Sequence, residues 1–187
     1  MTVNTSTAGT FVRFHPVKMR LPMIAVLAAL IAFLLLAPAH LESDETLANT
    51  AYRQMLAGNT KAAVALYRRA LERNPASPYR WCDFGEASLQ AGNTDMAKRC
   101  MTRAAALGPH MPQILLRAAN LAFALGDTDS ALSYGSRVLA IVPDYDEIVF
   151  STYERMGIPL GDITARGLPD GRAAESFAKY RVAQTSR

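Results

Sequence analysis

The feature that most constrains this chain is a short turn motif that recurs at intervals of 34 residues. The stretches AGNTKAA, AGNTDMA and LGDTDSA begin at Ala57, Ala91 and Leu125. Shifting the sequence by one period aligns five columns of identical residues, which are Gly58/Gly92/Gly126, Thr60/Thr94/Thr128, Ala63/Ala97/Ala131, Arg69/Arg103/Arg137 and Pro75/Pro109/Pro143. Five columns at one fixed period indicate a structural repeat rather than chance recurrence in an alanine-rich helical chain.

Each repeat contains two stretches in which apolar residues recur at helical spacing. The predicted helices are 44–57 and 60–73, 78–91 and 94–107, and 112–125 and 128–141. The aligned glycine is expected to end the first helix, because it adopts the left-handed conformation without strain. The Asn or Asp that follows is expected to cap the second helix, and the aligned proline to end it. The aligned alanines are small enough for two helices to cross closely.

A single helix pair cannot bury its apolar side, whereas stacked copies can. The sequence therefore predicts an all-α solenoid of about three helix pairs. The pattern Trp81…Gly85…Gly92…Ala97…Ala104…Pro109 resembles the tetratricopeptide repeat, and the first and third repeats match it less fully. The resemblance covers residues 44–143 and implies a right-handed α-solenoid whose concave face is lined by the first helix of each pair. The repeat signature comprises Gly58, Ala63, Pro75, Trp81, Gly85, Gly92, Ala97, Pro109, Gly126, Ala131 and Pro143.

The predicted repeats are 44–77, 78–111 and 112–145, and the period fades after Pro143. Residues 146–187 are predicted to form C-terminal capping helices and a tail, since a terminal repeat needs a polar outer side. Within them we expect another first helix over 146–156, a short helical turn over 161–165, a loop over 167–171 and an amphipathic helix over 172–183.

An uncharged apolar run from Leu21 to Ala39 precedes the repeats. As a helix its 19 residues would span ~28 Å, close to the ~30 Å of a bilayer core. Basic residues precede the run and acidic residues follow it, which predicts that the N-terminal side is cytoplasmic. We therefore expect a disordered cytoplasmic leader over 1–20, one transmembrane segment over 21–39, and a repeat domain in the periplasm of a bacterium.

Two alternatives to a retained anchor stay open. Ala37-Pro38-Ala39 fits a signal-peptide cleavage site before His40, which would release a secreted periplasmic adaptor. The run could instead be a buried helix of a soluble domain, although such a helix rarely lacks a polar face. The 20-residue leader and the nearly bilayer-length run favour the anchor.

Charge and cysteine content exclude some classes of function. Residues 42–187 carry 17 basic and 16 acidic side chains, so the repeat domain is almost neutral. That balance gives no indication of nucleic-acid binding, which requires a clustered basic face. Cys82 and Cys100 match no zinc or redox motif. An oxidising compartment would allow them to pair, but separate small thiols are favoured.

No catalytic constellation is present in the sequence. His15 and His40 lie in the leader and the linker, and His110 follows a helix-ending proline. The acidic residues Asp127 and Asp129 flank a helix start, where carboxylates suit the helix dipole. We expect no enzyme activity, no cofactor and no metal. The arginine column has two interpretations, an anion-binding ladder or surface arginines that cover neighbouring apolar residues, and the second is favoured.

The concave face is the candidate partner-binding site, and the resemblance implies which residues line it. They are Tyr52, Met55, Tyr79, Asp83, Glu86, Leu89, Arg117, Asn120 and Phe123. This mixture of aromatic, charged and amide side chains is typical of a peptide groove, although the C-terminal helices could cover it instead. Some family members clamp a terminal carboxylate there, but only Arg117 and Asn120 fit that pattern. The resulting hypothesis is a non-enzymatic, membrane-tethered interaction scaffold for a protein or peptide, accessory to envelope or exopolysaccharide assembly, or else a secreted peptide-binding adaptor.

Overall fold

The computed structural model describes residues 25–32 and 42–185. The chain divides into two units, Met1–Glu42 and Ser43–Arg187. In the first unit residues 25–32 are helical and exposed. Among the described residues no helix combines the length and apolar character that a membrane span requires. The predicted leader and most of the predicted transmembrane segment lie outside the described residues.

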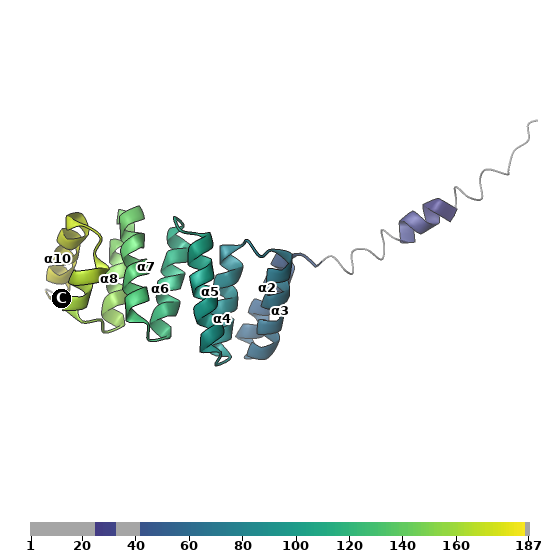
Figure 1. The fold of residues 1–187 in the computed structure, drawn as a ribbon, viewed down its shortest axis with the longest axis horizontal. Coiled ribbons are helices and arrows are strands. Elements are labelled where there is room, and N and C mark those ends of the chain that lie inside the picture. Colours follow the sequence, from purple (N-terminus) through teal and green to yellow (C-terminus); the bar gives the residue numbers. More distant parts are fainter. Residues whose placement is uncertain (1–24, 33–41, 186–187) are drawn as a thin grey trace, which may run out of the picture. The chain divides into compact units, whose positions relative to one another are not determined.

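The second unit is built from helix pairs joined by short turns (Figure 1). Its repeats consist of α2 (Asp44–Leu56) and α3 (Thr60–Arg73), α4 (Pro78–Gln90) and α5 (Thr94–Leu107), and α6 (Pro112–Ala124) and α7 (Thr128–Ile141). Every helix begins at the predicted residue, and each first helix ends one residue earlier than predicted. The fold over these residues is therefore an α-helical solenoid, as the period predicts.

The glycine turns confirm the predicted helix ends. Gly58, Gly92 and Gly126 have φ angles of 78°, 79° and 75°, in the left-handed region. Each glycine N–H donates to a carbonyl three residues earlier, for example Gly92 to Leu89 O at 2.9 Å. This geometry lets the chain leave the first helix and enter the second within three residues.

The predicted N-caps form in two of the three repeats. The Asn93 side chain accepts a hydrogen bond from Met96 N at 3.0 Å, and Asp127 accepts one from Ser130 N at 3.1 Å. Asn59 makes no such cap, because its side-chain amide donates to Gln54 Oε1 at 2.9 Å instead. Helix α3 forms nonetheless, so the turn does not require the side-chain cap. In the other two repeats the cap adds stability to α5 and α7.

We expect Gly92→Val to lower the free energy of unfolding by about 2 kcal/mol, because a β-branched residue is strained at positive φ. A Cβ at this position would meet no atom within 4 Å, so backbone strain alone would cause the loss. Urea denaturation of the full chain measures it, with Gly92→Asn as control because Asn tolerates the left-handed region. Equal stability of the valine variant and the parent would contradict this account of the turn.

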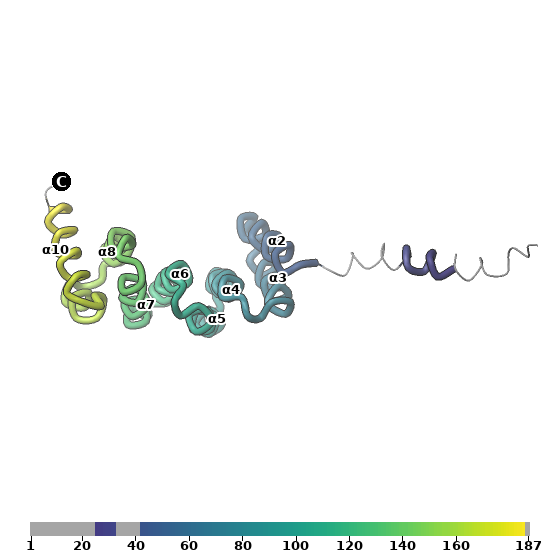
Figure 2. The backbone as a smooth tube through the Cα atoms, turned by 90° about the horizontal axis from the view of Figure 1, so that it is seen from above, coloured from purple at the N-terminus to yellow at the C-terminus, as the bar shows by residue number. Residues whose placement is uncertain are grey.

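The helices form two layers, and the first helices lie on the inner side of the stack. Figure 2 shows α2, α4, α6 and α8 (Asp146–Arg155) alternating with α3, α5 and α7 along the chain. Among the described helices, α4 contacts both α2 and α6, whereas the second helices approach one another less closely. Closer contact on one side bends the stack toward that side. The face formed by α2, α4 and α6, hereafter the inner face, is therefore the concave one.

Small residues occupy the helix crossings as predicted. Ala63 and Ala97 are fully buried and Ala131 nearly so. A Cβ on Gly85 would lie 2.9 Å from Leu121 Cδ2 of the next repeat and 3.1 Å from Cys100 Cβ of its own, so glycine allows close packing there. Trp81 joins two repeats, since its Nε1 donates to Pro75 O at 2.8 Å.

The third repeat departs from the pattern at Gly135, and the structure gives the reason. The equivalent positions in the first two repeats carry the buried side chains of Tyr67 and Met101. In the third repeat Tyr153 of α8 fills this space, and a Cβ on Gly135 would lie 2.2 Å from the Tyr153 hydroxyl oxygen. That hydroxyl donates to Gly167 O at 3.3 Å. The broken column therefore marks where the C-terminal segment inserts.

Beyond α8 the chain closes the C-terminal end of the stack. A helical turn, α9 (Leu160–Asp162), continues into a π-helical turn, η3 (Ile163–Gly167), and α10 (Gly171–Thr185) packs on α8. Phe150, Phe177 and Tyr180 form an aromatic cluster between α8 and α10, with ring centroids 5.0–6.5 Å apart. The predicted short turn and final helix are thus present, although α10 begins one residue earlier than expected and extends to Thr185.

Candidate functional site

A chain of ion pairs crosses the inner face from the first repeat to the third. Arg80 Nε lies 3.2 Å from Asp44 Oδ2, and Arg80 Nη1 lies 3.2 Å from Asp83 Oδ2. Arg117 Nη2 lies 2.8 Å from both Asp83 Oδ1 and Glu86 Oε1. This network, hereafter the inner-face ion chain, joins α2, α4 and α6 and contains three carboxylates and two guanidinium groups.

Arg117 is held in place rather than presented to solvent. Its side chain is 29% exposed, and its Nε also donates to Glu86 Oε1 at 2.9 Å. Partial burial disfavours the charge, but Glu86 and Asp83 outweigh that effect and raise the Arg117 pKa. Because both acceptors belong to the preceding repeat, Arg117 fastens α6 to α4. Two carboxylates of this chain therefore already occupy the guanidinium of Arg117, one of the predicted partner-binding residues.

Beside Arg117 the inner face is hollowed. The hollow has a volume of about 300 Å³ and is lined by Glu86, Leu89, Gln90, Arg117, Asn120, Leu121 and Ala124. Four of the nine predicted site residues therefore meet here, and Asp83 joins them through the ion chain. Asn120 is exposed, so its amide is available to a ligand. Apolar and polar groups thus converge between α4 and α6.

The other predicted residues lie apart from this hollow. Tyr52 and Tyr79 are 58% and 42% exposed on α2 and α4. Met55 and Phe123 are partly buried against the hydrophobic core and contribute to packing. The sequence also allowed the C-terminal helices to cover these residues. Among the described helices, however, α10 packs principally on α8.

Sequence reasoning missed Asp44 and Arg80, although a signal for the network was present. Asp83 and Arg117 are 34 residues apart, so they occupy the same position in adjacent repeats. Equivalent positions of neighbouring first helices lie side by side on an inner face. Opposite charges one period apart therefore predict an ion pair between repeats. Arg80 adds a pair within its own helix, three residues before Asp83.

The arginine column is not a continuous ladder. Arg137 donates to Pro109 O at 2.9 Å and lies over the ring of Tyr134 at 5.8 Å, so it secures the turn before the third repeat. Arg103 and Arg69 are exposed on α5 and α3.

Among the acidic residues at the third turn, Asp127 pairs with Lys98 and Asp129 pairs with Arg166. These contacts give both carboxylates a structural role.

The two cysteines are separate buried thiols. Neither Cys82 nor Cys100 forms a disulfide. Burial raises the pKa of the Cys82 thiol to about 12 and that of Cys100 to about 11. Since the thiolate is the reactive form, both should resist alkylation in the folded domain.

We expect the domain to lose stability as the pH rises above about 9. Unfolding restores an ordinary thiol pKa, so the unfolded state loses its thiol protons at a lower pH than the folded state. The stability that the protonated thiols contribute therefore declines until the pH passes their folded-state pKa values of about 11 and about 12. The slope is about 1.4 kcal/mol per pH unit for each thiol that titrates. Urea midpoints at pH 7 and pH 10 measure the effect. A double Cys82→Ala/Cys100→Ala variant should show a smaller decline, and an unchanged decline would contradict the assignment to thiols.

The geometry is that of stacked antiparallel helix pairs, and part of the chain matches a known repeat family. A profile of the tetratricopeptide repeat family matches residues 82–146, which span most of the second and third repeats. A search of curated proteins gave no match. The crystal structure of MamA is similar with a TM-score of 0.57 at 16% identity, covering 93% of this chain and 98% of that chain.

Two further solved structures are similar to this chain. The Yersinia enterocolitica type III secretion translocator chaperone SycD has a TM-score of 0.51 at 17% identity, covering 62% of this chain and 89% of that chain. SycD in complex with a peptide of the translocator YopD has a TM-score of 0.50 at 18% identity, covering 61% and 92%. At such identities the likeness concerns the fold alone, an α-helical solenoid of stacked helix pairs.

Proposed function

We propose that this chain is a membrane-tethered scaffold that holds a partner protein or peptide against its inner face. The observation that carries this proposal is the presence of large apolar side chains exposed on α2 and α4, the first helices of the first two repeats. Tyr52, Leu56 and Tyr79 are 58%, 71% and 42% exposed. Apolar contact area with a few convergent polar groups is the usual composition of a peptide-binding surface.

The partner binds along the first helices, with its apolar side chains on the exposed tyrosines and its polar groups near Asn120. Arg117 and Arg80 contribute by keeping α2, α4 and α6 in register, because their guanidinium groups are already paired. A rigid inner face reduces the ordering cost of binding. SycD, which has a similar fold, is solved in complex with a peptide of the translocator YopD, and this supports a protein or peptide as the class of partner.

The tether and the compartment rest on the apolar run over 21–39 and on the charges that flank it. We place the repeat domain on the periplasmic side of a bacterial inner membrane, where it serves envelope or exopolysaccharide assembly. Cleavage before His40 would instead release a periplasmic adaptor with the same inner face. Sequencing the N-terminus of the protein recovered from membranes distinguishes these two forms, because a chain that starts at His40 has lost the anchor.

Site-specific photocrosslinking of the full chain in cells tests the binding face. A crosslinker at Asn120 or Tyr79 should trap one partner, identified by mass spectrometry, while a crosslinker at Thr102 on α5 should not. Thr102 is a matched control because it is also exposed but lies on the second-helix layer. Adducts from Thr102 alone, or none from either inner position, would overturn the proposal.

A further inference from the structure

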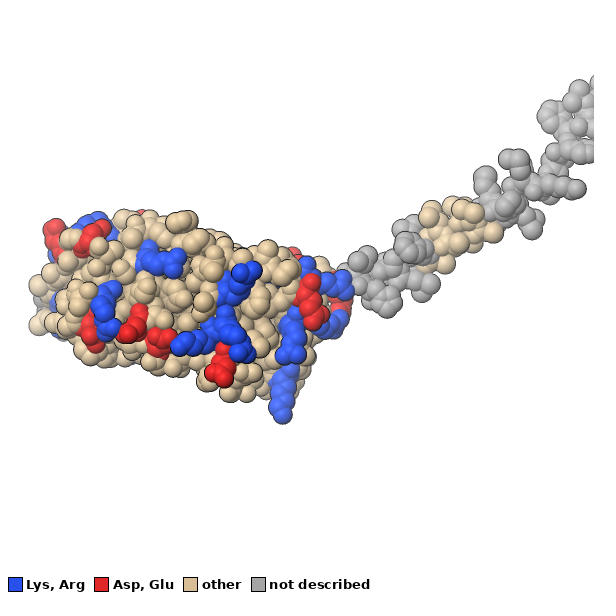
Figure 3. All heavy atoms as spheres, in the orientation of Figure 1, with Lys and Arg blue, Asp and Glu red and all other residues tan. Residues whose placement is uncertain are grey.

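The second helices of the first two repeats form a basic surface that the overall charge conceals. Helices α3 and α5 carry seven basic and two acidic side chains, a net charge of +5 on a domain that is almost neutral. All seven basic side chains are exposed, and they are Lys61, Arg68, Arg69, Arg73, Lys98, Arg99 and Arg103. Lys and Arg gather over α3 and α5 in Figure 3. We call these seven residues the outer basic face.

The charge is divided between the two layers of the solenoid. Helices α2, α4, α6 and α8 together carry seven acidic and four basic residues, so the first-helix layer has a net charge of −3. The molecule therefore presents opposite charges on its two sides. Such a division orients a protein against a charged surface without making the whole chain a strong polycation.

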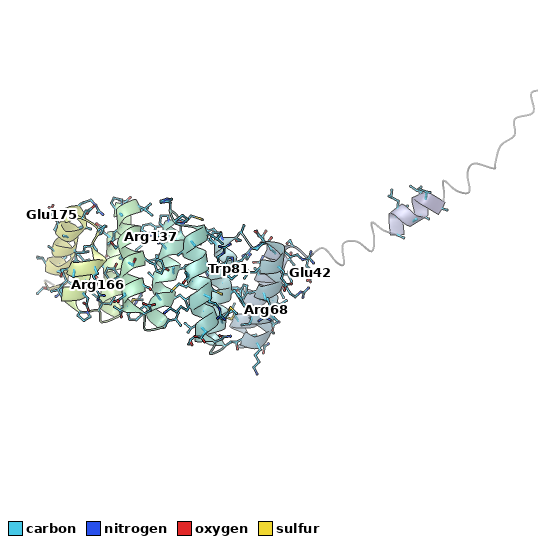
Figure 4. The ribbon with its side chains drawn as sticks, in the orientation of Figure 1. Glu42, Arg68, Trp81, Arg137, Arg166 and Glu175 are labelled. Carbon is cyan, nitrogen blue, oxygen red and sulfur yellow. The ribbon has the colours of Figure 1, made fainter. Side chains whose placement is uncertain are left out.

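Four of the seven side chains in the outer basic face form no ion pair with the described residues. Within residues 42–185 no carboxylate forms an ion pair with Lys61, Arg68, Arg99 or Arg103. Lys98 pairs with Asp127 at 3.3 Å, yet its side chain remains 64% exposed. Figure 4 marks Arg68 on α3. Lys61, Arg68, Arg99 and Arg103 differ in this respect from Arg80 and Arg117, whose guanidinium groups link neighbouring repeats.

The composition of the face selects the kind of partner. Among the described residues, α3 and α5 expose no large apolar side chain, and their one aromatic residue, Tyr67, is buried. A protein interface normally has an apolar or aromatic centre, and single-stranded nucleic acid binds through aromatic stacking. The basic side chains of this face are separated by small residues such as Ala65, Thr102 and Ala106. This composition is better suited to bind a surface whose negative charge is spread over a wide area.

We infer that the outer basic face binds the anionic headgroups of a phospholipid bilayer. The preference for lipid over another polyanion rests on the proposed tether, because an apolar run over 21–39 would keep the domain beside a membrane. In this arrangement α3 and α5 contact the headgroups and the inner face points away from the bilayer, where a partner can reach it. Electrostatic attachment of this kind weakens as salt screens the charges.

The test uses the full chain reconstituted in lipid nanodiscs, with a fluorophore at Thr102→Cys and a headgroup-located quencher. The native thiols are buried and should not be labelled. Quenching should be at least threefold greater in discs with ~30% phosphatidylglycerol than in neutral phosphatidylcholine discs, and should fall at ~0.5 M salt. A label at Asn120→Cys, on the inner face, should be quenched weakly in both compositions.

Two double variants of equal charge change provide the control. Arg68→Glu/Arg103→Glu should abolish the dependence on anionic lipid, since removing each charge weakens membrane association about fivefold. Arg53→Glu/Arg155→Glu, on α2 and α8, should retain it. Equal quenching in both lipids would overturn the inference. Co-purification from cells gives a further outcome. If the parent retains an acidic protein that the Arg68→Glu/Arg103→Glu variant loses, and quenching does not depend on the lipid, the face binds protein instead.

Failure of the tether would be seen separately. A chain that does not remain with neutral discs lacks the anchor, whatever the outer basic face does. Flotation of that soluble chain with anionic and neutral vesicles then decides the inference, because charge-dependent flotation supports it and equal flotation overturns it.

Discussion

Replacing Gly135 by Met should lower the free energy of unfolding by about 3 kcal/mol. Methionine is the residue that the second repeat carries at the same position, so the change restores the repeat pattern. It nevertheless conflicts with Tyr153, whose hydroxyl oxygen would lie 2.2 Å from the new Cβ. The buried tyrosine must leave, and its hydrogen bond to Gly167 O must break. Urea denaturation of the full chain measures the loss.

The same clash predicts where the damage occurs. Amide hydrogen exchange should show loss of protection in α8, η3 and α10, while α2 to α5 remain protected. Combining Gly135→Met with Tyr153→Ala should recover part of the stability, because the methionine then fills the space that the tyrosine vacates. Gly161→Ala is the control, since a Cβ there meets no atom within 4 Å. A Gly135→Met variant as stable as the parent would show that Tyr153 does not occupy this space.

Arg117→Glu should destabilise the domain by about 2 kcal/mol, since it places a third carboxylate against Asp83 and Glu86. The side chain is 29% exposed, so we expect less than the loss typical of a fully buried pair. We therefore expect the substitution to affect the fold itself as well as any partner bound at this predicted site residue. Thermal and urea unfolding of the full chain measure the loss.

Arg53→Glu is the matched control for Arg117→Glu. It introduces the same charge change in a first helix, but within residues 42–185 the Arg53 guanidinium donates a hydrogen bond to Thr50 and forms no ion pair. Exchanging the pair, as Asp83→Arg/Arg117→Asp, should restore part of the stability. If Arg117→Glu unfolds at the parent's urea concentration yet loses the crosslinked partner, Arg117 is an anchor for the ligand after all.

Most of the fold could be predicted because the determinants are local and repeated. A glycine at positive φ, a following capping residue and a helix-ending proline act within a few residues, and each occurs three times at one spacing. The exceptions show the limit of this reasoning. Asn59 occupies a capping position but donates its amide to Gln54, and which of these local bonds forms depends on the neighbouring side chain.

The candidate site could be predicted only in part. The resemblance brought Glu86, Leu89, Arg117 and Asn120 to one face, and the structure places them around one hollow. It did not show that Arg117 is already paired, because the position of its guanidinium depends on Asp83 and Glu86 across a repeat boundary. The arginine column offered an anion-binding interpretation of Arg69 and Arg103, but the sequence favoured a covering role, since a net charge summed along the chain cannot show how charges divide between two layers.

The sequence alone determined the helix pairs, their period and the glycine turns of this protein, because backbone conformational preferences and helical periodicity operate over short distances. The tertiary structure decided the rest. It showed that Tyr153 replaces the missing side chain at Gly135, that an ion chain joins three first helices, and that basic and acidic residues separate onto opposite sides. These features depend on contacts between residues that are distant in sequence, and only the stacking of the repeats brings those residues together.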